Sequence, residues 1–250
     1  MAKVIAPFKI VGSIDDLTFY IDQQGQNLVR EKGKTGVSKE AFQSNPVFDK
    51  VKKHSREFSR AIEKAKTFRA MAYPFFNRAK DGSFAGRANK LMFEIIAEDK
   101  VNPHGERTFE NGIQSNEAKT YPIGFEGNSL RPLHKVLKAK WNWNDSTATF
   151  TIENFNPFTN IDWPEAANQL HLAIGRAHWD YTNNLFTTEY SEEIIILKED
   201  NVNQIKLETK KPAGHHLQLT YLFIGFSSKI RGKTKELKRS YNTTTIIGVV

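Results

Sequence analysis

Apolar residues in this chain of 250 residues recur at a helical period in the first part and at a strand period in the last part. Between residues 38 and 80 the intervals are three, four and seven, which places these side chains on one side of a helix. The residues are Val47, Val51, Phe58, Ile62, Ala65, Phe68 and Ala72. From residue 138 onward, short apolar runs alternate with turn sequences, as in antiparallel sheets. The two periods predict an α+β fold, with an N-terminal β-hairpin and helices followed by an antiparallel β-sandwich.

Prolines and small polar residues indicate where the helices begin and end. Pro46 suits the first turn of the main helix, with Asn45 as its cap, and Pro74 should end or kink that helix. A second helix is expected over residues 83–98, after a turn at residues 81–83. Strands are expected over residues 136–143, 147–154, 170–180, 186–190, 193–197, 204–209, 217–226 and 241–250.

These elements divide the chain into four expected regions. Residues 1–37 form an N-terminal β-hairpin or arm, and residues 38–100 form a basic helical region. Residues 101–135, punctuated by glycines, are expected to connect the two parts through short irregular strands. Residues 136–250 form the β-sandwich domain.

The chain has no cysteine, which excludes disulfides, thiolate metal sites and cysteine nucleophiles. This composition fits the reducing cytoplasm. The N-terminus has no long apolar run of the kind found in secretory signals. The longest apolar runs, such as residues 221–226, are far shorter than the ~20 residues that span a bilayer. We therefore expect a cytoplasmic protein without a membrane span.

Catalytic motifs are missing from the sequence. It contains neither the G-x-S-x-G of a serine hydrolase nor the H-E-x-x-H of a zinc protease. His171 and His178 are seven residues apart in an expected strand, so their side chains face opposite sides and cannot share a metal. We expect no catalytic residue, metal or cofactor, and a non-enzymatic protein.

The net charge of +8 is unevenly distributed. Residues 28–90 carry 16 basic and 6 acidic residues, residues 229–239 carry 6 and 1, and the remainder has a net charge of −7. The basic helix face can be a solvated surface, a nucleic-acid contact or a dock for the acidic part of another copy. The residues proposed for such contacts are Lys52, Lys53, Arg56, Arg60, Lys64 and Arg69.

The C-terminal segment is an uncharged, β-branched strand. Such a strand must be paired, either in its own sheet or on the open edge of a neighbouring subunit. The candidate inter-subunit residues are Thr243, Thr245, Ile246, Ile247, Val249 and Val250. The apolar segment at residues 2–12 offers a second such arm.

Two tryptophans alternate in one expected strand. Trp141 and Trp143 share a face, which is typical of a sandwich core. If that face is exposed, it can stack on a sugar or a nucleic-acid base.

Several stretches resemble an uncharacterised family of Bacteroidota proteins with no assigned activity. They are GSIDDLTFYIDQQGQNLVREKGKTG, FNRAKDGSFAGRANKLMFEI, NPHGERTFENG and LQLTYLFIGF, which together span most of the chain. The resemblance implies a bacterial protein made in the cytosol.

Two functions are consistent with these observations. The first is a structural protein that assembles with itself into a polymer or large oligomer, through terminal strands and surfaces of complementary charge. The alternative is a nucleic-acid-binding protein that uses the basic helices, with a phage or a mobile element as a candidate origin.

Overall fold

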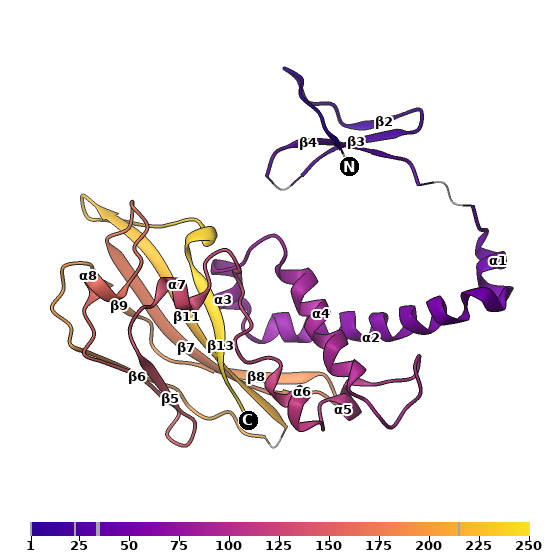
Figure 1. Ribbon diagram of the computed structural model, residues 1–250. Helices are drawn as coiled ribbons and strands as arrows, with labels where there is room; N and C mark the ends of the chain where they lie inside the picture. Colours follow the sequence, from indigo (N-terminus) through magenta and orange to yellow (C-terminus); the bar gives the residue numbers. More distant parts are fainter. Residues whose placement is uncertain (1, 23, 34–35, 215) are drawn as a thin grey trace. The chain divides into compact units, whose positions relative to one another are not determined.

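The computed structural model describes residues 2–22, 24–33, 36–214 and 216–250. Its chain divides into two compact units, one ending at Val51 and one spanning Lys52–Val250 (Figure 1). N-terminal strands and helices precede antiparallel sheets, so the predicted α+β class is confirmed.

The first unit is built on a four-stranded antiparallel sheet in the order β1-β4-β3-β2. The strands are β1 (Ala2–Lys3), β2 (Gly12–Ile14), β3 (Leu17–Ile21) and β4 (Asn27–Glu31). The turn between β3 and β4 uses Gly25 at a φ of 79°, a conformation that glycine adopts without a steric cost. The predicted hairpin is therefore present, and β1 and β2 extend it on both sides. The short helix α1 (Lys39–Ser44) follows, capped by the Ser38 hydroxyl.

The long helix begins where the sequence predicts. Asn45 caps a 3-10 turn over Pro46–Phe48, and α2 (Asp49–Met71) continues from it. The helix breaks at Ala72, and Pro74 lies in the first turn of α3 (Tyr73–Arg78). Helix α4 (Phe84–Ala97) follows within one residue of each expected end.

The connecting region contains short helices in place of the expected strands. These are α5 (Phe109–Gly112), α6 (Asn116–Thr120) and α7 (Leu133–Val136). The Thr108 hydroxyl caps α5. The strand pairing of the connecting region, residues 101–135, is limited to a single bridge between Glu126 and Thr245. Of the glycines in this region, Gly112 is the last residue of α5, and Gly105, Gly124 and Gly127 lie outside the short helices.

Two antiparallel sheets form the rest of the second unit. The larger has the order β12-β11-β7-β8, with β13 also paired to β11 and β9 to β7, and the smaller has the order β10-β6-β5. The strands are β5 (Trp141–Asn144), β6 (Thr149–Glu153), β7 (Gln169–Asp180), β8 (Leu185–Tyr190), β9 (Ile194–Leu197), β10 (Gln204–Glu208), β11 (Leu217–Ile230), β12 (Lys233–Glu236) and β13 (Thr243–Val249). A one-turn helix, α8 (Pro157–Asn160), and a 3-10 turn over Arg239–Tyr241 complete the unit. The sequence did not predict β12, and it ended β11 at residue 226.

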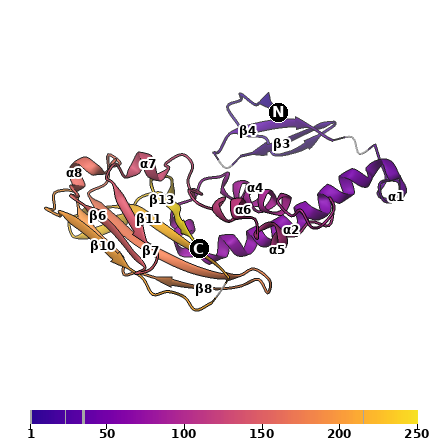
Figure 2. The same cartoon turned by 60° about the horizontal axis from the view of Figure 1, so that its bottom comes forward.

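The central strands of the larger sheet, β7 and β11, are buried on both faces. On one face, Phe68 and Phe76 from the helices pack with Tyr221 and Phe223 of β11. On the other face, the smaller sheet closes a second core that includes Phe150. Figures 1 and 2 show the helices and the smaller sheet on opposite sides of β7 and β11. The expected domain borders near residues 100 and 135 are therefore not borders of compact units, because the helices share a core with the sheet.

Candidate assembly and binding surfaces

At least three of the six basic residues assigned to the α2 surface bond to other elements of the fold, namely Arg60, Lys64 and Arg69. Arg60 Nη1 donates to the carbonyl oxygens of Gly105, at 3.3 Å, and Arg107, at 2.9 Å. Lys64 is buried, and its Nζ lies 2.6 Å from a Glu110 carboxylate oxygen. These long side chains hold the connecting region against the helix, so they are not open to a ligand.

The other basic residues on α2 differ in their exposure. Arg69 donates to Asn89 Oδ1 at 2.9 Å, which joins α2 to α4. Lys52 is half-buried, whereas Lys53 and Arg56 are exposed. The surface that the sequence offers to nucleic acid or an acidic neighbour is therefore smaller than predicted.

A buried carboxylate lies in the middle of this basic helix. Glu57 has no exposed surface, and it accepts hydrogen bonds from Arg107 Nε at 2.8 Å, Arg107 Nη2 at 2.7 Å and the Gly105 backbone N–H at 2.7 Å. Burial disfavours the charged form, but these hydrogen bonds outweigh it and lower the pKa of Glu57 to about 2. The sequence pattern does not reveal this pair because its partners are 50 residues apart.

The apolar side of α2 is buried only in its C-terminal half. Ala65 and Phe68 are fully buried, as predicted. Val51, Phe58 and Ile62 lie at the same helical spacing but are 54%, 41% and 40% exposed. The predicted core face is therefore wrong for the N-terminal half of the helix, where no other described element fully covers it. We call Val51, Phe58 and Ile62 the helix stripe.

The N-terminal sheet has one apolar face. The register pairs Ile14 with Leu17, Phe19 with Val29, and Ile21 with Asn27, so all of these side chains lie on one side. Ile14, Leu17 and Ile21 are 57%, 42% and 43% exposed, and Phe19 and Val29 are half-buried. We call Ile14, Leu17, Phe19, Ile21 and Val29 the sheet face.

This unit has no hydrophobic core among its described residues. Of these residues, Asn27 alone is buried. The opposite side of the sheet carries Ser13 and Thr18, whose hydroxyls lie 3.2 Å apart, and Arg30, together with the half-buried Tyr20 and Leu28. The side with the sheet face also carries Glu31 and Asn27, and the Asn27 side-chain amide lies 2.8 to 3.0 Å from the backbone of Ile10. The segment at Ile10 therefore covers this side at Asn27, while Ile14, Leu17 and Ile21 stay partly exposed.

The C-terminal strand closes its own sheet. Strand β13 pairs with β11 along its length except at a bulge at Ile247, and Val250 exchanges two backbone hydrogen bonds with Gln218, at 2.7 and 3.0 Å. Thr243, Thr245, Ile246 and Ile247 are buried, Val249 is half-buried, and Val250 is 60% exposed. The residues proposed as an inter-subunit strand are thus already paired within one chain.

The outer edge of β13 is partly covered by the connecting region. Gly124 N–H donates to Ile246 O at 2.8 Å, and Gly127 N–H donates to Thr244 O at 2.7 Å. The carboxylate of Glu126 accepts hydrogen bonds from Thr243 and Thr245. Burial raises the pKa of this carboxyl above its ordinary value.

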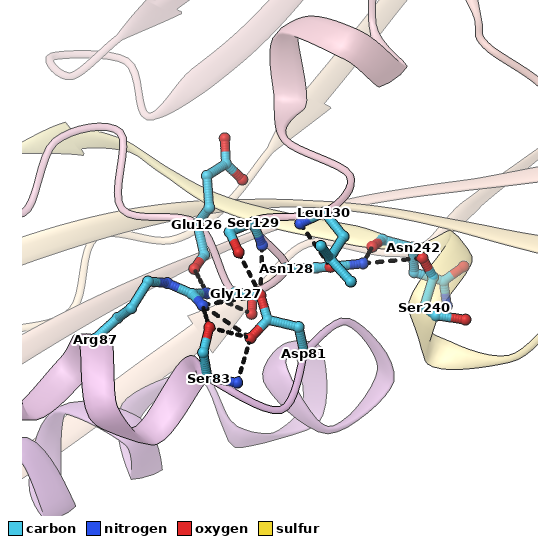
Figure 3. A network of polar contacts seen from close by, with 10 residues as sticks. All are labelled: Asp81, Ser83, Arg87, Glu126, Gly127, Asn128, Ser129, Leu130, Ser240 and Asn242. Carbon is cyan, nitrogen blue, oxygen red and sulfur yellow. Dashed lines mark hydrogen bonds and ion pairs between the residues drawn. The ribbon is translucent and has the colours of Figure 1, made fainter. Parts of the chain in front are cut away.

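A polar network fixes that covering segment (Figure 3). Asp81 accepts from Arg87 and from the Ser129 N–H and hydroxyl, at 2.7 to 2.9 Å. Burial opposes ionisation of Asp81, but these bonds outweigh it and hold the pKa of the carboxyl below its ordinary value. Asn128 Nδ2 donates to the carbonyl oxygens of Ser240 and Asn242, at 3.0 and 2.9 Å. The network therefore joins the turn before α4 to the entry of the C-terminal strand.

A serine, a histidine and a glutamate form a hydrogen-bonded chain in the large sheet. His171 Nε2 lies 2.7 Å from Ser227 Oγ, and His171 Nδ1 lies 2.7 Å from Glu193 Oε1. The hydrogen bond with His171 and the guanidinium of Arg78, acting against burial, lower the pKa of Glu193 to about 2. This is the bonding order of a catalytic triad.

The burial of Ser227 argues against a catalytic role for this series of hydrogen bonds. Ser227 is completely enclosed, and its hydroxyl also lies 3.0 Å from Gln169 Oε1. A substrate carbonyl therefore cannot reach the serine in this structure. The bonds connect β7, β11 and the segment before β9, and we assign them to holding the sheet.

The two tryptophans on β5 are not buried to the same extent. Trp143 is half-buried and packs on the core between the sheets. Trp141 is 38% exposed and lines an open hollow with Lys138, Lys140 and Asn142. The expected core position is therefore wrong for Trp141.

Within the described part of the chain, no helix has both the length and the apolar character that a bilayer span requires. Comparison with protein-family models, with curated proteins and with solved structures gives no match to this chain. The resemblance to a Bacteroidota family accordingly stays a prediction.

Proposed function

We propose that the protein is a non-enzymatic structural protein that assembles with itself into a large oligomer or polymer through its N-terminal sheet. The sheet face carries this proposal, because its three outer residues are 42% to 57% exposed in a unit without a core. A small sheet is stable only when its apolar face packs against another element.

A second copy of the chain is the partner that we propose. Each copy carries two different exposed apolar surfaces, the sheet face and the helix stripe. Contacts between unlike surfaces build rings or open filaments, whereas contacts between like surfaces stop at a pair. A cytoplasmic location, which the lack of cysteine favours, is part of the same proposal.

Two earlier candidates for the subunit contact are weaker. The C-terminal strand is paired within its own chain, and three of the six basic residues on α2 are engaged inside the fold. Of these six residues only Lys53 and Arg56 are exposed, so nucleic-acid binding by the α2 surface would rest on them together with the exposed Lys50 and Lys66.

The test compares two substitutions on neighbouring residues of β3. Leu17→Asp places a carboxylate in the sheet face, and Thr18→Asp places the same group on the polar side of the sheet. A buried, unpaired carboxylate costs several kcal/mol, so we expect Leu17→Asp to weaken assembly at least about 100-fold. Thr18→Asp should assemble like the unchanged protein.

Assembly is measured on the full chain by light scattering after gel filtration and by negative-stain electron microscopy. All four tryptophans lie beyond residue 140, so their fluorescence reports folding of the second unit separately. The proposal fails if the unchanged protein is a single copy at high concentration, or if both variants lose assembly equally.

A further inference from the structure

A strongly basic surface of the second unit is a two-stranded ribbon that projects from the large sheet. Strand β7 pairs with β11 as far as Ser227, whereas β11 continues to Ile230 and β12 returns beside it. Arg231 and Gly232 form the turn at positive φ, 50° and 79°, as two-residue hairpins require (Figure 1, yellow, upper left). Beyond Ser227 the ribbon therefore has no third strand beside it.

The base of the ribbon is held in place. Asn168 Oδ1 accepts from the Lys229 N–H at 2.8 Å, and Asn168 Nδ2 donates to the Lys229 carbonyl at 3.1 Å. At the same end, Leu237 N–H donates to Phe226 O at 2.9 Å. The ribbon thus leaves the sheet in a defined direction.

Six cations lie on the ribbon and on the segment that follows it. All six are exposed, and within the described residues none of them forms an ion pair. The one acid, Glu236, lies 3.0 Å from Arg78 and is therefore already paired. The cations are Lys229, Arg231, Lys233, Lys235, Lys238 and Arg239. We call residues 228–239 the basic ribbon.

Repulsion between these cations raises the free energy of the protein when no ligand is bound. Lys233 and Lys235 are two residues apart on one strand, so they share a face at a separation of about 7 Å. Like charges at this separation repel each other, and the repulsion is relieved when a polyanion binds. A dense row of negative groups is thus the ligand that this surface favours.

We propose that the basic ribbon binds the phosphate backbone of double-stranded DNA without sequence specificity. A two-stranded ribbon fits the major groove of B-DNA, which is about 12 Å wide. Lysine and arginine side chains contact phosphates there, and the hydroxyl of Ser228, which lies on the same face as Lys233 and Lys235, is suited to donate to a phosphate oxygen. The proposal is independent of assembly through the sheet face.

The test uses the full chain and a fluorescent duplex of about 30 base pairs, with affinity measured by anisotropy at several salt concentrations. The double variant Lys233→Gln/Lys235→Gln removes two of the six cations and keeps the strand residues polar. Each lost phosphate contact lowers the salt slope by about 1, so we expect a slope smaller by about 2 and binding at least 10-fold weaker in low salt.

The matched control is Lys53→Gln/Arg56→Gln, which removes two exposed cations from α2 and leaves the ribbon unchanged. Similar losses in both pairs, or a larger loss in the control, would overturn the assignment to the ribbon. Binding that is absent or insensitive to salt would overturn it as well. If the ribbon variant instead changes the mass of the assembly and leaves DNA affinity unchanged, the ribbon contacts another copy and the DNA proposal is wrong.

Discussion

Replacing Glu57 with glutamine tests how the basic helix is held against the connecting region. The substitution keeps the shape of the side chain and an oxygen that can accept from the Gly105 N–H. It removes the charge that pairs with Arg107, and it turns an acceptor-only group into one that also donates. The same oxygen still accepts from Arg107 Nε, but Arg107 Nη2 loses its acceptor at 2.7 Å, and the guanidinium loses the negative charge that it pairs with.

Two estimates of the cost agree. Removing one partner of a buried ion pair costs about 3 to 5 kcal/mol, and the lower end applies because the Arg107 side chain is 20% exposed and can partly reach water. Separately, a pKa of Glu57 lowered from 4.5 to about 2 corresponds to roughly 3 kcal/mol, at about 1.4 kcal/mol for each pH unit. We therefore expect the free energy of unfolding of the second unit to fall by about 3 kcal/mol.

Urea unfolding followed by tryptophan fluorescence at pH 7 measures this loss, and the melting temperature should fall by about 6 to 12 °C. The control is Glu63→Gln, a change in an exposed carboxylate on the same helix, which should cost less than about 0.5 kcal/mol. A loss below about 1 kcal/mol for Glu57→Gln would show that the pair does not hold the connecting region as we argue.

The same pair gives a pH dependence of known sign. The pKa of Glu57 is lower in the folded protein than in the unfolded chain, so its contribution is complete above about pH 5. The contribution is lost as the pH falls from about 4.5 towards 2. The difference in unfolding free energy between the unchanged protein and Glu57→Gln should therefore shrink over that range. A difference that stays constant down to pH 2.5 would contradict the lowered pKa.

Three further substitutions test the packing, with the same urea assay. A Cβ at Gly112 would lie 2.0 Å from the Ile95 carbonyl oxygen, so we expect Gly112→Ala to cost at least about 3 kcal/mol. A Cβ at Gly86 in α4 would meet no atom within 4 Å, so Gly86→Ala should instead stabilise the protein by about 0.5 to 1 kcal/mol. Equal effects at the two glycines would refute the close approach of Gly112 to the Ile95 carbonyl. The buried hydroxyl of Tyr221 has no hydrogen-bond partner within the described residues, so Tyr221→Phe should leave stability unchanged or raise it by up to about 1 kcal/mol. A loss above 1 kcal/mol for Tyr221→Phe would reveal a partner for that hydroxyl.

Local sequence signals predicted most of the secondary structure. The break at Ala72 follows from Pro74, because proline has no N–H and fixes its own φ. The strands of the large sheet follow from runs of apolar residues between turns, and β7 lies within one residue of its expected start. These signals act over a few residues, so they can be recognised without knowing the fold.

The same signals did not predict a strand made of charged and polar residues. Strand β12 has the sequence Lys-Thr-Lys-Glu and carries no apolar residue, so its pattern resembles a loop. It forms because β11 continues beyond the sheet and provides the pairing edge. The short helices of the connecting region were missed for a related reason, since one turn is too short to show a period.

The sequence by itself determined most of the longer helices and strands, where most of them end and how charge is distributed along the chain. Tertiary structure alone decided which of those charges and apolar groups are accessible. Lys64 is buried by partners 46 and 117 residues away, Glu110 and Tyr181, while Leu17 is left partly exposed because its unit has no second layer. The physical reason is that burial depends on contacts between segments distant in sequence, which the period of a single segment does not contain.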